Sequence, residues 1–335
     1  MIAAMWFEEL LGFPENGGPH AVRERLELSG DQLRSKVNGR VVGCGRLEVL
    51  SLAELRSRGA GAGLVGSGSR SQVREHVGGV QALHADSANA GALFQAASQF
   101  NLLEMAHPSV TPEGGVGIYQ NDHTQGPACA IACGGGTVYR NYFVPLGDQL
   151  GQTAHRQVDC LAALGERLGN EGDRLWTMRN GYALATSAGL QEISERLATS
   201  DDSERDSLRA ALRIGVQWDV EVTQSNAGHA VTQVYGSALP VGYSDHGSAA
   251  WEPFARLILE ASYEATLWAA ALNAQASGCD KVFLTLLGGG VFGNERAWIL
   301  DAVDRAISRV PVQDLDLIIV SYGQSNPHIR GWLEG

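Results

Sequence analysis

The sequence predicts an α/β protein with three layers, in which a mixed sheet lies between two layers of helices. Two patterns near the C-terminus lead to this class. The apolar residues of 254–272 fall on one helical stripe, and an apolar strand over 282–286 follows. After a glycine-rich turn come a helical pattern over 296–309 and a last strand over 315–320. Strands joined through a helix at these spacings form a right-handed parallel crossover.

The turn after strand 282–286 is the most informative segment. Three consecutive glycines occur there, with a fourth three residues later. Glycines let peptide N–H groups converge on an anion, and the helix that follows adds unpaired N–H groups and its positive dipole end. A simple connection without a ligand would need only one or two glycines. We therefore expect a phosphate or diphosphate to be bound by Gly288, Gly289, Gly290, Val291, Phe292, Gly293 and Asn294.

The first sixty residues predict a helical extension packed on the core. Charged helical patterns occupy 21–35 and 50–58, with a hairpin-like turn at 37–40 between them. The next segment, 60–69, is rich in glycine, and Gly61, Gly63 and Gly66 have the GxGxxG spacing, but they directly follow the helical pattern of 50–58 rather than a strand. We interpret it as a strand with a loop and assign no dinucleotide site to it.

Further elements follow from local patterns. The apolar run 91–98 comes after turn-forming residues and predicts a buried strand. Segment 122–133 changes from polar to small apolar residues and predicts a helix with Asp122 at its N-cap. Strands are expected over 214–222 and 230–235. We expect a main domain of residues 61–335 beside the extension of 1–60.

An insertion at about 150–210 elaborates the predicted core. Amphipathic helices are expected over 153–168 and 190–212, the second with a new N-cap signal at residues 200–203. Between them, 175–182 reads as a strand that ends in an Asn-Gly turn.

Composition excludes several classes of partner. The formal charge is −12, from 37 acidic against 25 basic residues, and no basic block is present. Nucleic acid is therefore not an expected partner, because phosphate neutralisation supplies most of that affinity. The first eleven residues carry acids and no cationic leader, so we expect neither a signal peptide nor a membrane anchor.

The five cysteines favour a reducing, cytoplasmic setting, since their number is odd and no CxxC pair occurs. Cys129 and Cys133 lie four residues apart on one face of the expected helix. They could hold a metal together with a histidine, or they could be core thiols. Their small apolar neighbours favour core thiols.

At this point the residues resemble a known family. Segment 279–294 is similar to the second diphosphate loop of macrodomains, a strand that ends in a turn of the type Ser-Thr-Gly-Val-Phe-Gly. Asp86 and the run 94–101 resemble the aspartate and the Asn-Ala-Ala-Asn strand that meet adenine and the distal ribose. Segments 113–119 and 122–125 correspond to the glycine loop and acidic helix start of poly-ADP-ribose glycohydrolases.

The resemblance covers roughly residues 80–145 and 210–325 and is greatest to the MavL-type macrodomains, which it implies remove ADP-ribose from arginine. Two departures are present: the loop has two adjacent glycines, Gly114 and Gly115, rather than three, and Asp-His-Thr-Gln replaces Gln-Glu-Glu. The scheme needs no metal or cofactor. Beside the residues of the glycine turn, the implied ligand-binding residues are Asp86, Phe94, Asn101, Gly115, Gln125, Tyr322 and Phe13.

Cleavage of a glycosidic bond at ribose passes through an oxocarbenium-like transition state, which a carboxylate stabilises. Asp122 is the first candidate, and it has two compatible interpretations, a catalytic group and a plain N-cap. Asp219 and Glu221 form a second candidate pair, because strand alternation would place both on one face. Their alternative is the solvated face of an edge strand, which we favour slightly.

The sequence therefore predicts a hydrolase that releases ADP-ribose from modified protein side chains, with arginine as the expected linkage. Asp122 would be the catalytic residue, with Asp219 or Glu221 in support. Two alternatives stay open, a binding protein for ADP-ribose without turnover and an enzyme of free ADP-ribose derivatives. Tyr322 and Phe13 would stack on adenine or ribose, Phe13 only if the N-terminal segment folds over the cleft.

Overall fold

The computed structural model describes residues 6–66 and 73–334. Within these residues, seven strands form the central sheet, and β11 runs antiparallel to its two neighbours while the others share one direction. The mixed sheet of the predicted α/β class is thereby confirmed. In spatial order the strands are β4 (Arg46–Ser51), β11 (Arg213–Glu221), β12 (Ala230–Gly236), β6 (Leu93–Ala97), β13 (Lys281–Leu284), β14 (Asp316–Ser321) and β5 (Val73–Val77).

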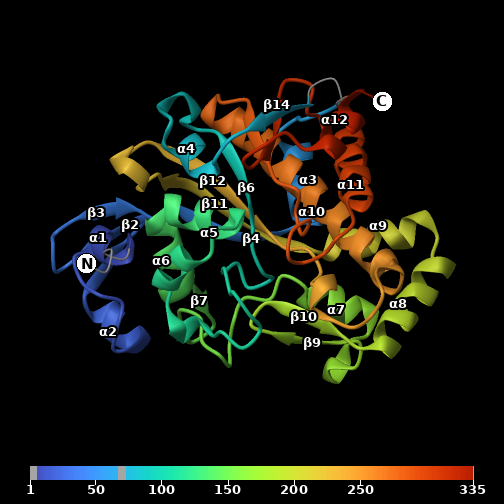
Figure 1. Ribbon diagram of the computed structural model, residues 1–335, viewed down its shortest axis with the longest axis horizontal. Coiled ribbons are helices and arrows are strands. Elements are labelled where there is room, and N and C mark those ends of the chain that lie inside the picture. Colours follow the sequence, from blue (N-terminus) through green and yellow to red (C-terminus); the bar gives the residue numbers. More distant parts are fainter. Residues whose placement is uncertain (1–5, 67–72, 335) are drawn as a thin grey trace.

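Helices cover both faces of this sheet (Figure 1). One face carries α3 (Leu52–Gly61), α10 (Ser248–Ser277) and α11 (Arg296–Arg309). The other face carries α4 (Val80–Ala85), α5 (Gln125–Ala132) and α6 (Gly134–Tyr142). The predicted three-layer arrangement is therefore confirmed.

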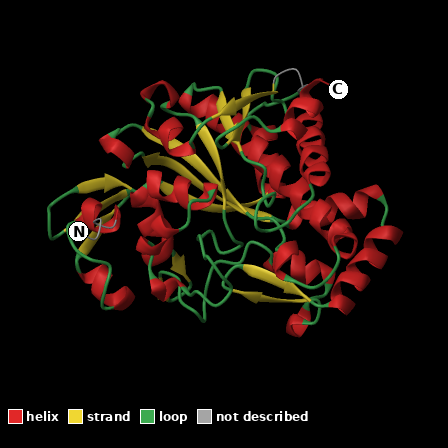
Figure 2. Ribbon diagram, in the orientation of Figure 1, coloured by secondary structure: helices red, strands yellow, loops and turns green. Residues whose placement is uncertain are grey.

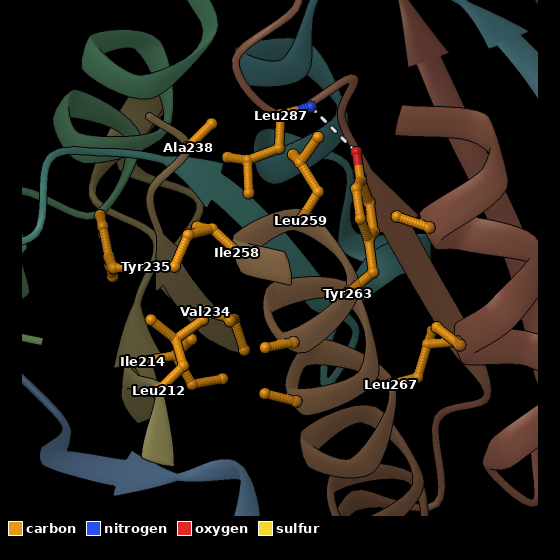
Figure 3. Close-up of a cluster of buried hydrophobic side chains, with 14 of the residues drawn as sticks. Leu212, Ile214, Val234, Tyr235, Ala238, Ile258, Leu259, Tyr263, Leu267 and Leu287 are labelled. Atoms are coloured by element: carbon orange, nitrogen blue, oxygen red, sulfur yellow. Dashed lines mark hydrogen bonds between the residues drawn. The ribbon is translucent and has the colours of Figure 1, made fainter. Parts of the chain in front are cut away.

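Alternation along β12 shows how one strand serves both layers. Val234 packs toward α10, where Figure 3 places it near Ile258 and Ile214. The next residue, Tyr235, faces the opposite layer, and the guanidinium carbon of Arg140 lies 3.6 Å from the centre of its ring. Both faces of the sheet are therefore buried, which explains the near-continuous apolar strands.

The C-terminal crossover matches its sequence pattern closely. The stripe over 254–272 lies inside α10, and α11 spans the predicted 296–309. The strands predicted over 282–286 and 315–320 are β13 and β14, which pair in parallel. A further helix, α12 (Pro327–Glu334), follows β14.

The N-terminal segment is less helical than expected. The predicted helix over 21–35 was wrong, because the chain leaves α2 (Gly18–Glu24) and forms the hairpin of β1 (Leu26–Ser29) and β2 (Gln32–Ser35). Gly30, at φ 61°, supplies the left-handed turn residue that this hairpin needs. The turn predicted at 37–40 connects β2 to β3 (Val41–Gly43), and α1 is Trp6–Leu11.

The boundary predicted near residue 60 does not coincide with a break in the sheet. Strand β4 pairs with β11 and so belongs to the central sheet, although it lies within the first sixty residues. Helix α3 continues to Gly61, and part of the strand predicted over 60–69 lies outside the described residues.

The insertion forms the lower part of the molecule in Figure 2, where a two-stranded hairpin lies beside helices. The predicted Asn-Gly turn is present, with Asn180 at φ 48° and Gly181 at φ 80°. The helix predicted over 153–168 begins only at Ala162, because Gln152 donates to the carbonyls of Asn101 and Arg140 and accepts from the N–H of Val158, which holds the chain in a loop there. The elements are β7 (Pro145–Leu146), β8 (Gln149–Leu150), α7 (Ala162–Leu168), β9 (Trp176–Arg179), β10 (Tyr182–Ala185), α8 (Ser187–Thr199) and α9 (Asp202–Ala211).

An ion network fastens this insertion to the helical layer beside it. Glu264 of α10 accepts hydrogen bonds from Arg56 of α3 and Arg305 of α11, both at 2.6 Å. Both arginines also donate to Asp206 of α9, at 2.7 Å and 3.2 Å. Four helices from separate parts of the sequence therefore share one set of charges.

Short 3₁₀ helices connect several of the elements. They are η2 (Ser87–Asn89), η3 (Pro112–Gly114), η4 (Gly117–Asn121), η5 (Glu171–Asp173), η6 (Gln224–Asn226) and η7 (Val241–Tyr243). None of the helices found in residues 6–66 and 73–334 has the length and apolar character needed to cross a membrane.

Candidate functional site

Two adjoining cavities lie at the edge of the sheet where the parallel strands end. The larger has a volume of about 930 Å³ and the smaller about 220 Å³. Open α/β sheets bind ligands at this edge, which makes the pair the candidate site. The two cavities share a wall made of Asp122, Thr124, Gln125, Thr285 and Leu286.

The larger cavity is formed by the ends of β5 and β14 and by the starts of several helices, among them α4, α5, α11 and α12. Gly78 to Gln81 lead from β5 into α4, and Gln324 to His328 lead from β14 into α12. Tyr322 also lines it and is 86% exposed. An exposed aromatic ring of this kind is suited to stacking on a base or a sugar.

The smaller cavity lies where β6 and β13 end. It is lined by the turn after β6, by Glu104 to Ala106, and by most of the glycine turn after β13. Its outer wall is aromatic, since Tyr182, Tyr243 and Phe292 meet with ring centres 5.2 to 5.6 Å apart. Tyr182 belongs to β10, so the insertion contributes directly to this cavity.

The glycine turn has the geometry of an anion site. Gly288 and Gly293 both adopt φ 72°, which other residues rarely do. No hydrogen bond among the described residues engages the N–H groups of Gly290, Val291 and Phe292, and all three line the smaller cavity. These donors are therefore available to a ligand, and ligand binding by the turn stays a prediction.

Side chains from the helical layer hold the start of this turn in place. The Tyr263 hydroxyl donates to the carbonyl of Thr285 at 2.6 Å. It also accepts from the N–H of Leu287 at 2.9 Å, as Figure 3 shows. The Thr285 N–H donates to Gln95 of β6 at 3.1 Å. At the other end of the turn, the Asn294 amide donates to the carbonyl of Leu239 at 2.8 Å. The turn is thus fixed before any ligand arrives.

Arg296 is a residue of this site that the sequence analysis missed. It is the first residue of α11, lines the larger cavity, and donates to the carbonyl of Gly289. A cation at a helix N-terminus opposes the helix dipole, so this position is unfavourable unless an anion lies nearby. That mismatch, directly after a glycine turn, is the sequence signal that could have identified it.

Asp122 lines both cavities and also stabilises the turn that leads into α5. Its carboxylate accepts a hydrogen bond from the Thr124 N–H at 2.9 Å. The local role and the position in the wall therefore coexist. Gln125, in the same wall, donates to the carbonyl of Gln95 and accepts from the N–H of Ala97, which ties the start of α5 to β6.

Glu104 is the second missed residue, and the most unusual one. It lines the smaller cavity, is 6% exposed, and its Oε1 atom has no hydrogen-bond partner in the part of the chain that the structure describes. Burial raises the pKa of Glu104 well above the ordinary value, an effect that Arg140 opposes and Asp122 reinforces. Its sequence signal was a single acid within Leu-Leu-Glu-Met, an otherwise apolar run.

The glycine loop at Gly115 has a different occupant from the one expected. The carboxylate of Glu15 accepts hydrogen bonds from the N–H groups of Val116, at 2.8 Å, and Gly117, at 2.5 Å. It also accepts from the Tyr142 hydroxyl at 2.7 Å. The N-terminal segment thus fills this loop with the chain's own anion, and Gly115 is not among the described residues that line the two cavities.

Asp86 and Phe94, which were also expected to bind the ligand, do not line either cavity. Asp86 is exposed and precedes β6, so it lies near the opposite edge of the sheet, where it accepts from the Ala88 N–H. Phe94 is buried between His84 and Phe283, with ring centres 3.7 and 4.4 Å away. These positions correct the placement of both residues at the ligand.

Asn101 and Phe13 also lie away from the cavities. Asn101 is fully buried and accepts from the N–H of Leu103, so it shapes the loop that carries Glu104. Phe13 is buried against Phe7, with ring centres 5.4 Å apart, and does not fold over the cleft.

The predicted acidic pair on β11, Asp219 and Glu221, does not lie at the site, and the reason is geometric. A bulge interrupts β11 between Gln217 and Val220, and Asp219 has φ 53°, so regular alternation fails there. Glu221 accepts a hydrogen bond from the Gly43 N–H at 2.6 Å. Because β11 is antiparallel to its neighbours, its end lies at the sheet edge opposite the cavities, and both carboxyl groups are remote from the site.

No group of His, Cys, Asp and Glu side chains in residues 6–66 and 73–334 is arranged to hold a metal ion. Cys129 and Cys133 are buried and unbridged. Burial raises the pKa of both thiols, as expected of core cysteines.

No protein-family model and no curated protein matches the chain. Among solved structures it is similar to the poly(ADP-ribose) glycohydrolase of Thermomonospora curvata, at 14% identity and a TM-score of 0.46, over 94% of this chain and 95% of that one.

It is also similar to the poly(ADP-ribose) glycohydrolase of Deinococcus radiodurans in complex with ADP-ribose. There the identity is 14% and the TM-score 0.43, over 86% of this chain and 94% of that one. At this level of similarity, the fold and the function are both argued from this chain's own residues.

Proposed function

We propose that the protein hydrolyses the glycosidic bond between ADP-ribose and a modified protein side chain. The observation that carries the proposal is the row of N–H groups at Gly290, Val291 and Phe292, which no described residue binds and which opens into a cavity that also holds two carboxyl groups. Backbone N–H groups in a glycine turn bind phosphate oxygens well. Carboxyl groups are what cleavage at an anomeric carbon requires.

The remaining parts of the cleft fit the two halves of such a ligand. The larger cavity, with exposed Tyr322 and several amide and hydroxyl side chains, has the size and polarity for an adenosine. Arg296 lies beside the glycine turn, where it would neutralise a diphosphate. The smaller cavity would then receive the second ribose, with Glu104 and Asp122 at its walls.

Asp122 stays a candidate for charge stabilisation or water activation at the reacting carbon, because it lies in the wall that both cavities share. The linkage to the protein is a separate question. The overall resemblance of the chain to MavL-type macrodomains implies arginine. In support, the described residues that line the smaller cavity include two acids and no cation, a setting that favours a cationic guanidinium.

Calorimetric titration with ADP-ribose, AMP and NAD, followed by product analysis on arginine-, glutamate- and serine-linked substrates, tests the proposal. We expect ADP-ribose to bind more tightly than AMP, and free ADP-ribose to be released from at least one linkage. Binding without any release would favour the alternative of an ADP-ribose reader. Binding of AMP alone would favour an enzyme of free nucleotides.

A further inference from the structure

We infer that Glu104 is the catalytic proton donor of the cleft and acts on the atom that leaves the ribose. This inference rests on the proposed function and assigns its chemistry to a residue that the sequence pattern did not indicate. Four features of the surroundings of Glu104 support it.

The first feature is an unsatisfied carboxyl group in a cavity wall. Buried polar atoms nearly always have hydrogen-bond partners, since leaving one without a partner is costly. Glu104 is almost completely buried, yet no described residue pairs with its Oε1 atom. A carboxyl group kept in this condition beside an open cavity is suited to a ligand atom.

The second feature is a rigid support for the backbone of Glu104. Its N–H donates to the Tyr119 hydroxyl at 3.1 Å, and the N–H of Met105 donates to Gln99 at 2.6 Å. The hydroxyl of Tyr182 donates to the carbonyl of Met105 at 2.5 Å. Bonds on both sides of the residue fix the direction of its side chain, as a proton donor requires.

The third feature is the space reserved for the carboxyl group. Gly126 lies in the first turn of α5, and a Cβ atom there would collide with the Glu104 carboxylate and with the carbonyl of Ala97. The missing side chain at Gly126 is therefore what lets Glu104 reach the start of α5. The positive end of a helix favours a carboxylate once the proton has left.

The fourth feature is a buried cation, Arg140, which can stabilise the negative charge that Glu104 carries once it has given up its proton. Arg140 is 1% exposed, donates to the carbonyl of Leu102, and has an unpartnered Nη1 atom within the described residues. Burial keeps Glu104 protonated by raising its pKa, while Arg140 opposes this effect. Both protonation states are thus supported, as a group that gives and regains a proton needs.

The step can be written for ADP-ribose linked to a hydroxyl side chain. The Glu104 carboxyl gives its proton to the linking oxygen while the bond from that oxygen to the anomeric carbon breaks, and the bond electrons stay with the oxygen. Water then forms a bond to the anomeric carbon and returns a proton to the Glu104 carboxylate. The products are the free side-chain hydroxyl and ADP-ribose, and the enzyme is regenerated.

Several ionisable groups lie close enough to Glu104 to interact with its charge. Arg140 comes from α6, and Asp122 precedes α5. The other groups are Tyr119 of η4, Cys129 of α5, Tyr182 of β10 and Tyr235 of β12.

The test compares Glu104→Gln with wild type on a serine-linked substrate, using kcat, KM and the Kd for ADP-ribose. We expect kcat to fall by about 10² to 10⁴, the usual contribution of a general acid. The Kd should stay within about threefold, since the amide has the same shape. Retained ADP-ribose binding also shows that the variant is folded.

Asp159→Asn is the matched control, because burial also raises the pKa of Asp159 and this residue lies outside both cavities. It should keep kcat within about threefold. In wild type and in this control, kcat should fall as the pH rises through the pKa of Glu104, whereas the residual rate of Glu104→Gln should lack that limb.

Leaving groups sharpen the assignment. Glutamate-linked ADP-ribose departs as a carboxylate that needs no proton, so the loss on Glu104→Gln should be smaller there than on the serine linkage. A Glu104→Gln variant with more than about a third of wild-type kcat on the serine linkage overturns the inference, and the proposed function stands. Equal losses on both linkages also overturn it. If wild type cleaves only the arginine linkage, the two proteins are compared on that substrate, and a Glu104→Gln variant with more than about a third of wild-type kcat overturns the inference there. A wild type that binds ADP-ribose and releases none overturns the proposed function and the inference together.

Discussion

The protein has two glycine loops near its predicted site, and they differ in what their N–H groups bind. In the loop of Gly288–Gly293, three consecutive N–H groups open into a cavity. In the loop at Gly115, the N–H groups of Val116 and Gly117 bind the carboxylate of Glu15. The sequence predicts a bound anion for the first loop, whereas for the second the resemblance implies only a ligand contact at Gly115. In the second loop the N–H groups bind an anion that belongs to the chain itself. Glycine content identifies a cradle, and only the tertiary structure tells whether it is free.

A bulky residue placed in each loop in turn should produce the largest difference between the two loops, measured as the loss of ADP-ribose binding. A Cβ at Gly290 would meet no atom within 4 Å, and one at Gly114 would meet only Val110 at 3.9 Å, so both sites tolerate a side chain. We expect Gly290→Trp to weaken ADP-ribose binding by roughly 100-fold or more, because the indole would fill the smaller cavity. Gly114→Trp should change the Kd, measured by calorimetry, by less than about threefold. Similar losses in both variants would mean that the loop at Gly115 also binds the ligand.

Removing the Glu15 carboxylate tests the role of the loop at Gly115. Glu15→Ala leaves two buried N–H groups and the Tyr142 hydroxyl without their acceptor. Hydrogen bonds to a charged group contribute about 1.5 to 3 kcal/mol each and are not additive, so we expect a loss of about 2 to 4 kcal/mol in the free energy of unfolding. Urea unfolding measures this loss, while calorimetry should show unchanged ADP-ribose binding. Tighter binding in the variant would show that Glu15 competes with the ligand.

The loop of Gly288–Gly293 also differs from the loop at Gly115 because a cation, Arg296, lies beside it. Arg296→Met should weaken ADP-ribose binding about tenfold and reduce its dependence on salt, because a phosphate contact is lost. Arg309→Met, at the other end of α11, is the control and should bind as wild type does. Equal salt dependence in wild type and Arg296→Met would place the diphosphate elsewhere.

A second comparison concerns the carboxyl groups of Glu104 and Glu113, whose pKa values shift in opposite directions. Burial raises the pKa of Glu104, so the folded state holds this proton more tightly than the unfolded chain does. The stabilisation is complete below the ordinary pKa of 4.5 and is lost as the pH rises toward the raised value. The stability of Glu104→Gln relative to wild type should therefore increase with pH above about 4.5, by up to ~1.4 kcal/mol per pH unit.

Glu113 provides the control of opposite sign. Its burial, the largest effect, raises its pKa, but hydrogen bonds from the Ala154 N–H and Thr111 together lower the pKa below the usual value. Its stabilisation is present above the ordinary pKa and is lost as the pH falls. Glu113→Gln should therefore lose stability relative to wild type as the pH rises, and the same trend for both variants in urea titrations would contradict these assignments.

Local patterns predicted the C-terminal half of the fold well. The helix over 296–309 and the glycine turn before it depend on neighbouring residues, so periodicity and turn chemistry suffice there. The N-terminal helix over 21–35 failed because Gly30 allows a hairpin whose second strand also pairs with β3. Strand pairing of this kind involves residues that the local pattern does not include.

The site was harder to predict than the fold. Glu104 becomes a cavity residue only because Arg140, Tyr119 and Tyr182 hold its loop from distant parts of the chain. A bulge at Asp219 removed the regular alternation on which the acidic pair depended. Both outcomes come from tertiary contacts, and neither leaves a periodic signal in the sequence.

The most direct measurement is an NMR titration of the backbone N–H signals with ADP-ribose. If the loop of Gly288–Gly293 is the diphosphate cradle, the signals of Gly290, Val291 and Phe292 should shift and reach saturation. Those of Val116 and Gly117, already bound to Glu15, should stay in place. Saturating shifts at Val116 and Gly117 with none at the other three residues, or no shifts at all, would contradict the account.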